Sequence, residues 1–120
     1  MVGLNDLDGS KHHVRKKVSN FLNDLIGMGV KGFRVDASKQ MWPRDLMKMQ
    51  NLTMDLPDGG RPFFYHQVID MGGEAISDEE YHELGRVTEY RFSFKLFTCI
   101  SNRDYDYCAN MYDEVGEQWT

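Results

Sequence analysis

Residues 32–43, GFRVDASKQMWP, decide how the rest of the chain is interpreted. A short apolar run ends in an arginine and an aspartate two residues apart, and then breaks into a turn before Pro43. Because side chains alternate along a strand, Arg34 and Asp36 lie on the same face of the predicted strand. A carboxylate at the carboxyl end of a strand, with a fixed cation beside it, suits an ionised nucleophile.

A glutamine occupies the position where such a nucleophile would need a partner acid. Gln67 lies 31 residues beyond Asp36, in a second strand-like run that is rich in apolar and aromatic residues. A carboxylic acid there would complete a pair for acid–base chemistry, whereas an amide has no proton to give. The sequence therefore combines a well-placed aspartate with an unsuitable partner.

Composition and charge indicate one small globular domain. The chain has 120 residues, 41% of them hydrophobic and 28% charged, which is enough for one core and not two. The net charge of −5 argues against a nucleic-acid-binding surface. No apolar run is long enough to span a membrane, and residues 1–5 show no secretory signal. The two cysteines lack a CxxC pattern, so they predict no metal site and decide no redox compartment.

The hydrophobic pattern predicts helices and strands in alternation. The strongest helix covers residues 12–28, because the apolar residues at 14, 18, 21, 22, 25 and 26 fall on one stripe. Gly29 is a predicted left-handed cap, and Pro43 suits the first position of a shorter helix that reaches residue 50. The other predicted elements are strands over 32–36, 63–69 and 86–90, a surface helical turn over 77–84, a helix near 93–100 and an irregular tail over 101–120.

This alternation is typical of a parallel sheet with right-handed crossovers. Three good strands are predicted, or four if residues 3–7 are counted. A flavodoxin-type sheet has about five strands, and a (β/α)8 barrel needs about 250 residues. On size, the chain is either a compact open sheet or a section of something larger.

Further segments extend the pattern of residues 32–43. They are GLNDL at 3–7, FYHQVIDMGGE at 64–74 and GRVTEY at 85–90, with a fainter GEQW at 116–119. In this order and spacing, the segments closely resemble animal-type α-amylases of the α-amylase clan of glycoside hydrolases. The resemblance covers residues 1–100 well and 101–120 weakly, and it implies that 1–120 is a fragment of an α-amylase-like catalytic domain.

The resemblance implies a partial (β/α)8 TIM barrel, from about strand four to the helix after strand six. It also implies retaining endo-hydrolysis of α-1,4-glucans such as starch and glycogen. That reaction uses two carboxyl groups about 5–5.5 Å apart, one as nucleophile and one as acid/base. Asp36 matches the nucleophile position, and Gln67 stands at the acid/base position.

The resemblance also implies calcium and chloride as cofactors. Arg34 matches a chloride-binding residue, and Asp6 matches a calcium-ligating carboxylate. Gln40 replaces a histidine whose backbone carbonyl binds calcium and whose ring meets the sugar. Of the two roles, the carbonyl contact could survive this change and the ring contact could not. Lys39, Gln40 and Glu74 match residues that contact the substrate.

The departures from the family pattern reduce the expected activity. Loss of a general acid costs about 10²–10⁴-fold in rate. His66 is expected to face the opposite side of the strand from Gln67, and Asp70 and Glu74 lie too far along to replace it. The family's third catalytic aspartate and its remaining calcium and chloride ligands fall beyond the matching region. The isolated chain is therefore expected to be inactive on starch, as a pseudoenzyme would be.

Three alternatives follow. The chain is a partial α-amylase, a non-catalytic relative that binds glucans or a protein partner, or an unrelated small α/β domain. An Asn-His-Asp segment in continuing sequence would favour the first, a true stop codon the second, and a complete flavodoxin-like sheet the third. Open barrel edges predict self-association, with an α-1,4-glucan as the expected ligand and no nucleic acid or membrane partner. The family is secreted, whereas the chain shows no signal peptide.

Overall fold

The computed structural model describes residues 6–103 of the chain. These residues form two compact units, which are described separately. The first contains residues 6–68 and 78–88, and the second contains residues 69–77 and 89–103. The predicted strand at residues 3–7 and the predicted irregular tail lie wholly or mostly outside the described residues.

The first unit begins with helix α1, His12–Gly27, close to the predicted 12–28. Its carboxyl end is closed by Gly29, which has φ 100°. The Gly29 N–H donates to the Ile26 carbonyl at 2.9 Å, and the Val30 N–H donates to the Leu25 carbonyl at 3.0 Å. This pair of bonds is the Schellman arrangement, and it confirms the predicted left-handed cap.

Three parallel strands form the sheet, in the order β1-β2-β3. They are β1 Gly32–Val35, β2 Phe63–His66 and β3 Arg86–Val87. The strands are parallel, as predicted, and shorter than predicted. The register aligns Arg34 with Tyr65, and Tyr65 with Arg86. Residues two apart on β1 and β2 therefore line the same face across both strands.

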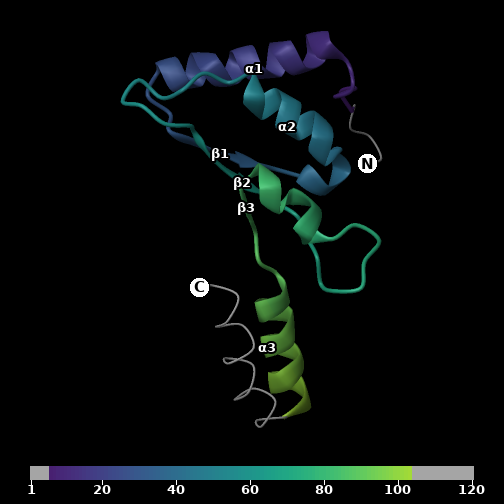
Figure 1. The fold of residues 1–120 in the computed structure, drawn as a ribbon. Coiled ribbons are helices and arrows are strands. Elements are labelled where there is room, and N and C mark those ends of the chain that lie inside the picture. The colour runs from purple at the N-terminus through teal and green to yellow at the C-terminus, as the bar shows by residue number, and fades with distance from the viewer. Residues whose placement is uncertain (1–5, 104–120) are drawn as a thin grey trace. The chain divides into compact units, whose positions relative to one another are not determined.

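Helix α2, Pro43–Asn51, starts at the predicted proline and packs against α1 (Figure 1). The Ser19 hydroxyl of α1 donates to the Met49 carbonyl of α2 at 2.8 Å. In Figure 1 the two helices lie together on one side of the strands. This layer leaves the face with Arg34 and Asp36 exposed.

The core of this unit gathers Leu46, Val68, Tyr81 and Leu84. Tyr81 and Leu84 come from η2, Asp78–Leu84, a short 3-10 helix. The prediction of a surface turn at 77–84 was wrong for these two side chains. The Tyr81 hydroxyl donates to the Met41 carbonyl at 3.0 Å, so a contact across 40 residues draws the segment inward.

The apolar stripe of α1 is buried unevenly. Ile26 is fully buried, whereas Phe21, predicted on the same stripe, is 60% exposed. Phe21 lines an apolar groove of about 360 Å³ with Leu22, Leu25 and Phe33. The groove lies beside β1, which is an outer strand of the sheet that residues 6–103 form. No described strand covers this side of β1, so the stripe is only partly buried.

The second unit contains helix α3, Arg91–Asn102, two residues longer at each end than predicted. Both carboxylate oxygens of Glu89 accept from the Phe92 N–H, at 2.9 and 3.1 Å, which satisfies a free donor of the first turn. Arg91 forms an ion pair with the buried Asp70 at 2.8 Å. Within residues 6–103, no helix has the length and apolar character needed to cross a membrane.

Candidate active site at the ends of two parallel strands

The predicted nucleophile position lies at the carboxyl end of β1. Arg34 and Asp36 share the exposed face, as predicted, and the Arg34 guanidinium donates to an Asp36 carboxylate oxygen at 2.5 Å. The Asp36 side chain is 71% exposed. An ion pair this exposed to water contributes little to the free energy of unfolding. Its effect is to place a positive charge next to the Asp36 carboxylate.

Directly after Asp36 the chain makes a sharp turn. Ala37 has φ 51° and ψ 34°, a left-handed conformation that is unusual for a residue with a Cβ. The short 3-10 helix η1, Ser38–Gln40, follows. The turn ends β1 before Asp36 and leaves the aspartate beyond the last ladder residue.

Gln67 holds this turn through both its backbone and its side chain. Its N–H donates to the Val35 carbonyl at 2.9 Å, and its carbonyl accepts from the Ser38 N–H at 3.1 Å. Its side-chain oxygen Oε1 accepts from the Ala37 N–H at 2.8 Å. The structure therefore brings the nucleophile and acid/base positions to one turn. The amide accepts a hydrogen bond there and supplies no acidic proton.

His66 lies on the opposite face of β2 from Gln67, as expected from alternation. It is fully buried, and its ring lies 6.4 Å from the Tyr81 ring, centroid to centroid. Nδ1 is 2.9 Å from the Ser38 hydroxyl, and Nε2 is 3.0 Å from the Gln50 side-chain nitrogen. Burial lowers the pKa of His66, while the Leu84 backbone acts in the opposite direction. Strand alternation predicted the opposite face for His66 but gave no signal for the Gln50 contact.

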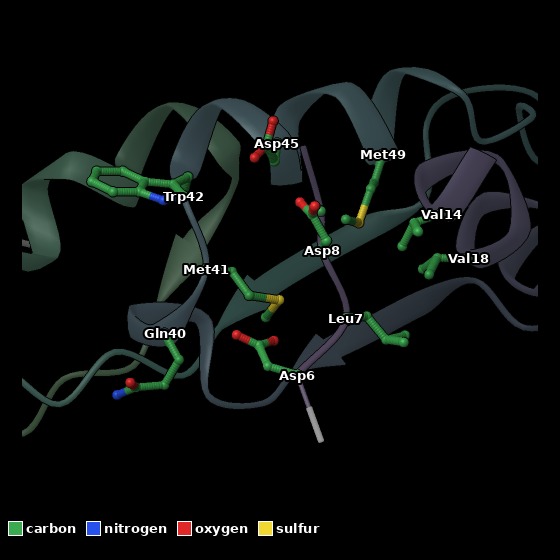
Figure 2. A pocket seen from close by; sticks show the side chains of 11 residues that line it. Asp6, Leu7, Asp8, Val14, Val18, Gln40, Met41, Trp42, Asp45 and Met49 are labelled. Carbon is green, nitrogen blue, oxygen red and sulfur yellow. The ribbon is translucent and has the colours of Figure 1, made fainter. Parts of the chain in front are cut away.

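Asp6 and Gln40 face a common pocket of about 560 Å³ (Figure 2). Figure 2 shows both residues beside Met41, with Asp8 and Asp45 also lining the space. A hydrogen bond from the Ser10 hydroxyl is the largest influence that lowers the pKa of Asp8. The residues that line this pocket include neither Asp36 nor Gln67.

The pocket fits a calcium site only in part. No group of three or more histidine, cysteine, aspartate or glutamate residues within 6–103 could hold a metal ion. Calcium takes 6–8 oxygen ligands, more than Asp6 and the Gln40 carbonyl provide. Calcium and chloride therefore remain proposals for this chain.

A buried ion pair beside this pocket was not predicted. The Arg15 guanidinium donates to the Gly9 carbonyl at 2.8 Å and lies 3.7 Å from Asp45 Oδ1. Both side chains are nearly buried. Arg15 is a single inward residue within a basic stretch of α1, so it leaves no periodic signal in the sequence.

The two remaining predicted substrate contacts lie in different units. Lys39 is half-buried in η1, close in sequence to Asp36. Glu74 lies in the second unit, where its Oε1 accepts from the Met71 N–H at 3.3 Å. The roles predicted for both residues stay predictions.

Fold and site together define a section of an α/β barrel. Parallel strands alternate with helices, and polar side chains gather where two strands end, which is where barrel enzymes place their active sites. No protein-family model matches the chain.

Comparison with known proteins gives the family. The chain is 45% identical to pancreatic α-amylase of Sus scrofa and 52% identical to α-amylase of Oryzias latipes, each over 99% of the chain and 24% of the relative. A solved structure of α-amylase I from Eisenia fetida, a Glu-to-Gln mutant in complex with maltohexaose, has a TM-score of 0.74 and 48% identity. It covers 77% of this chain, which corresponds to 20% of that structure.

The chain belongs to the animal α-amylases and corresponds to part of their catalytic (β/α)8 barrel. It spans about a quarter of the length of the curated relatives it matches. The predicted family and the predicted partial barrel are thereby confirmed.

Proposed function

We propose that this chain is the nucleophile-bearing section of a barrel that acts on α-1,4-glucans by a retaining mechanism. The observation that carries the proposal is the 2.8 Å hydrogen bond from the Ala37 N–H to Gln67 Oε1, which ties the two catalytic positions to one turn. Asp36, beside Arg34, is the nucleophile that attacks the anomeric carbon. The glucan substrate is supported by the relatives, one of which holds maltohexaose.

Gln67 limits what the chain can do with an ordinary glucan. The sugar oxygen that leaves needs a proton, and the amide cannot provide one. The same position would activate water in the second step of a retaining reaction. We therefore propose that the chain does not hydrolyse starch by itself, and that an ester on Asp36, once formed, persists.

The other family residues complete this proposal. Arg34 would hold chloride next to Asp36, and Asp6 with the Gln40 carbonyl would supply part of a calcium site. Lys39, Gln40 and Glu74 would contact the sugar chain. The calcium ion would contribute structural stability, and no chemical step in the proposal passes through it.

A donor whose leaving group needs no proton tests the role of Asp36. With α-maltosyl fluoride, an Asp36 oxygen bonds to the anomeric carbon while the C–F bond breaks, and fluoride departs as an ion. Intact mass spectrometry is expected to show one added maltosyl group on the chain, located at Asp36 by peptide mapping. The Asp36→Asn variant is expected to show none.

Two results would contradict the proposal. Starch hydrolysis by the unchanged chain would show that Gln67 does not block the reaction. Absence of labelling, or equal labelling of the Asp36→Asn variant, would show that Asp36 is not a nucleophile in this chain.

A non-catalytic role in glucan binding is the second candidate. Phe63 is 55% exposed on the face of β2 that also carries Tyr65 and Gln67, and the two rings lie 6.2 Å apart, centroid to centroid. Exposed aromatic rings with polar groups beside them suit a sugar surface. Under this alternative, maltohexaose shifts the NMR signals of these rings while α-maltosyl fluoride leaves no label. Phe63→Ala should then weaken binding, with Leu52→Ala as an exposed apolar control.

A further inference from the structure

The buried side chains beneath the candidate catalytic turn form a connected line. It runs from Gln50 of α2 through His66 of β2 to Ser38 of η1. Ser38 and His66 are both fully buried, so their side-chain polar atoms depend on protein partners. The line ends at the Val35 carbonyl, 3.0 Å from the Ser38 hydroxyl, at the end of β1.

Every hydrogen bond along this line has one donor and one acceptor if the protons are donated in the order Gln50, His66, Ser38 and the Val35 carbonyl. The Gln50 Nε2 group is a donor, so His66 Nε2 accepts from it and carries no proton. The proton of a neutral imidazole is then on Nδ1, which donates to the Ser38 hydroxyl oxygen. The Ser38 hydroxyl proton in turn goes to the Val35 carbonyl.

The opposite order of donation would place two N–H groups against each other, those of His66 and Gln50. If Ser38 donated to Nδ1, the ring proton would be on Nε2 and would face the N–H groups of Gln50. The Val35 carbonyl would also lose the Ser38 hydroxyl as a donor. A hydrogen bond to the Leu84 backbone raises the pKa of His66 in opposition to burial, because it favours an N–H on the ring.

We propose that His66 is a positioning residue, held in its Nδ1–H form, that fixes the turn of Asp36 and Ala37 through Ser38. The inference rests on the proposed function in treating Asp36 as the nucleophile. Ser38 follows the left-handed Ala37 directly, and its N–H bonds to the Gln67 carbonyl. A hydroxyl anchored from below holds Ser38 in place, and the Ala37 N–H thereby stays aimed at Gln67 Oε1.

The ring tautomer is the first test. In protein labelled with ¹⁵N-histidine, long-range ¹H–¹⁵N spectra at neutral pH distinguish the two ring nitrogens. His66 is expected to show the proton on Nδ1. A signal from the Nε2–H form, or from a mixture of both, would overturn the proposed direction.

Amide hydrogen exchange is the second test, and neither test uses a glucan. In His66→Phe, the Ala37 and Ser38 amides are expected to exchange roughly tenfold faster relative to Ile26, a buried amide of α1 that reports on global opening. His66→Asn should restore most of the protection, because its side-chain N–H can replace Nδ1–H. His13→Asn, on the exposed surface of α1, is the matched control.

The outcomes separate positioning from packing. Equal acceleration at Ile26, Ala37 and Ser38 in both His66 variants would mean that His66 only stabilises the fold. If His66→Phe does not fold, Ser38→Ala removes the hydroxyl alone and should free the same two amides. Unchanged exchange in Ser38→Ala would overturn the proposal. If the tautomer and exchange results are as expected but α-maltosyl fluoride does not label Asp36, only the proposed function is contradicted.

Discussion

Gln67 differs from a glutamate at the same position by one side-chain group, an amide nitrogen in place of a carboxyl oxygen, and this difference changes its chemistry without changing its position. An amide and a carboxyl group are nearly the same shape, and Gln67 Oε1 accepts from the Ala37 N–H as a carboxylate oxygen would. That N–H would stabilise the charged form of a glutamate at this position. In a Gln67→Glu variant, the Ala37 N–H would therefore favour the ionised carboxylate, whereas a general acid must carry a proton.

His66 makes the stability of the fold depend on pH. Burial lowers its pKa below the ordinary 6.5, so below about pH 6.5 the unfolded chain binds a proton that the folded chain does not. The free energy of unfolding is expected to fall as the pH drops from 6.5 toward the folded pKa, with a slope of at most about 1.4 kcal/mol per pH unit.

Urea unfolding from pH 7.5 down to pH 5 measures this dependence. His66→Asn is expected to lose this part of the slope, while His13→Asn controls for the loss of one imidazole from the surface of α1. A slope that survives removal of His66 would show that another group causes it.

At the scale of the elements, the approach of β3 to β2 depends on Gly85. Its φ is 149°, and a Cβ built there would lie 2.5 Å from the Phe64 carbonyl oxygen. The contact is with backbone, so no side chain can move to relieve it. Gly85→Ala is expected to lower the free energy of unfolding by about 2–4 kcal/mol, because β3 must separate from β2.

Gly59 provides the matched control for this substitution. It also has positive φ, 92°, but a Cβ there would meet nothing within 4 Å. Gly59→Ala carries the conformational cost alone, and should be destabilising by about 1 kcal/mol. Equal losses in the two variants, measured by thermal unfolding, would show that the close approach at Gly85 is unimportant.

The elements also show what a sequence pattern can and cannot predict. Local signals in the sequence predicted α1, α2 and the three strands. Hydrophobic periodicity, the cap at Gly29 and the helix start at Pro43 depend only on residues that are close in sequence. The pairing of Arg34 with Asp36 followed from strand alternation for the same reason. The inward side of η2 and the line from Gln50 to Ser38 depend on partners far along the chain, which no local pattern encodes.

At the scale of the whole molecule, the described sheet has two outer strands. Each of β1 and β3 pairs with β2 alone within residues 6–103. Phe21 and Phe33 line an apolar groove next to β1, and Phe63 is exposed on the open face. An open strand edge beside apolar surface favours association with other chains.

We expect the chain to self-associate and to unfold with low stability as a dilute monomer. Sedimentation velocity over a concentration series should show a rising average mass. Phe21→Glu is expected to reduce this association, while Leu52→Glu, at the end of α2, controls for added charge at an exposed apolar position. A monodisperse monomer with a cooperative thermal transition would contradict the expectation.

The hydrogen bonds of Gln67 also affect which substitutions residue 67 can accept during evolution. The codons for glutamine and glutamate differ by one base, and the backbone around residue 67 uses its N–H, carbonyl and side-chain oxygen in ways that both residues allow. Selection could therefore move this position between amide and acid without passing through a misfolded intermediate. A change between glutamine and glutamate at this position would therefore be reversible in a single step.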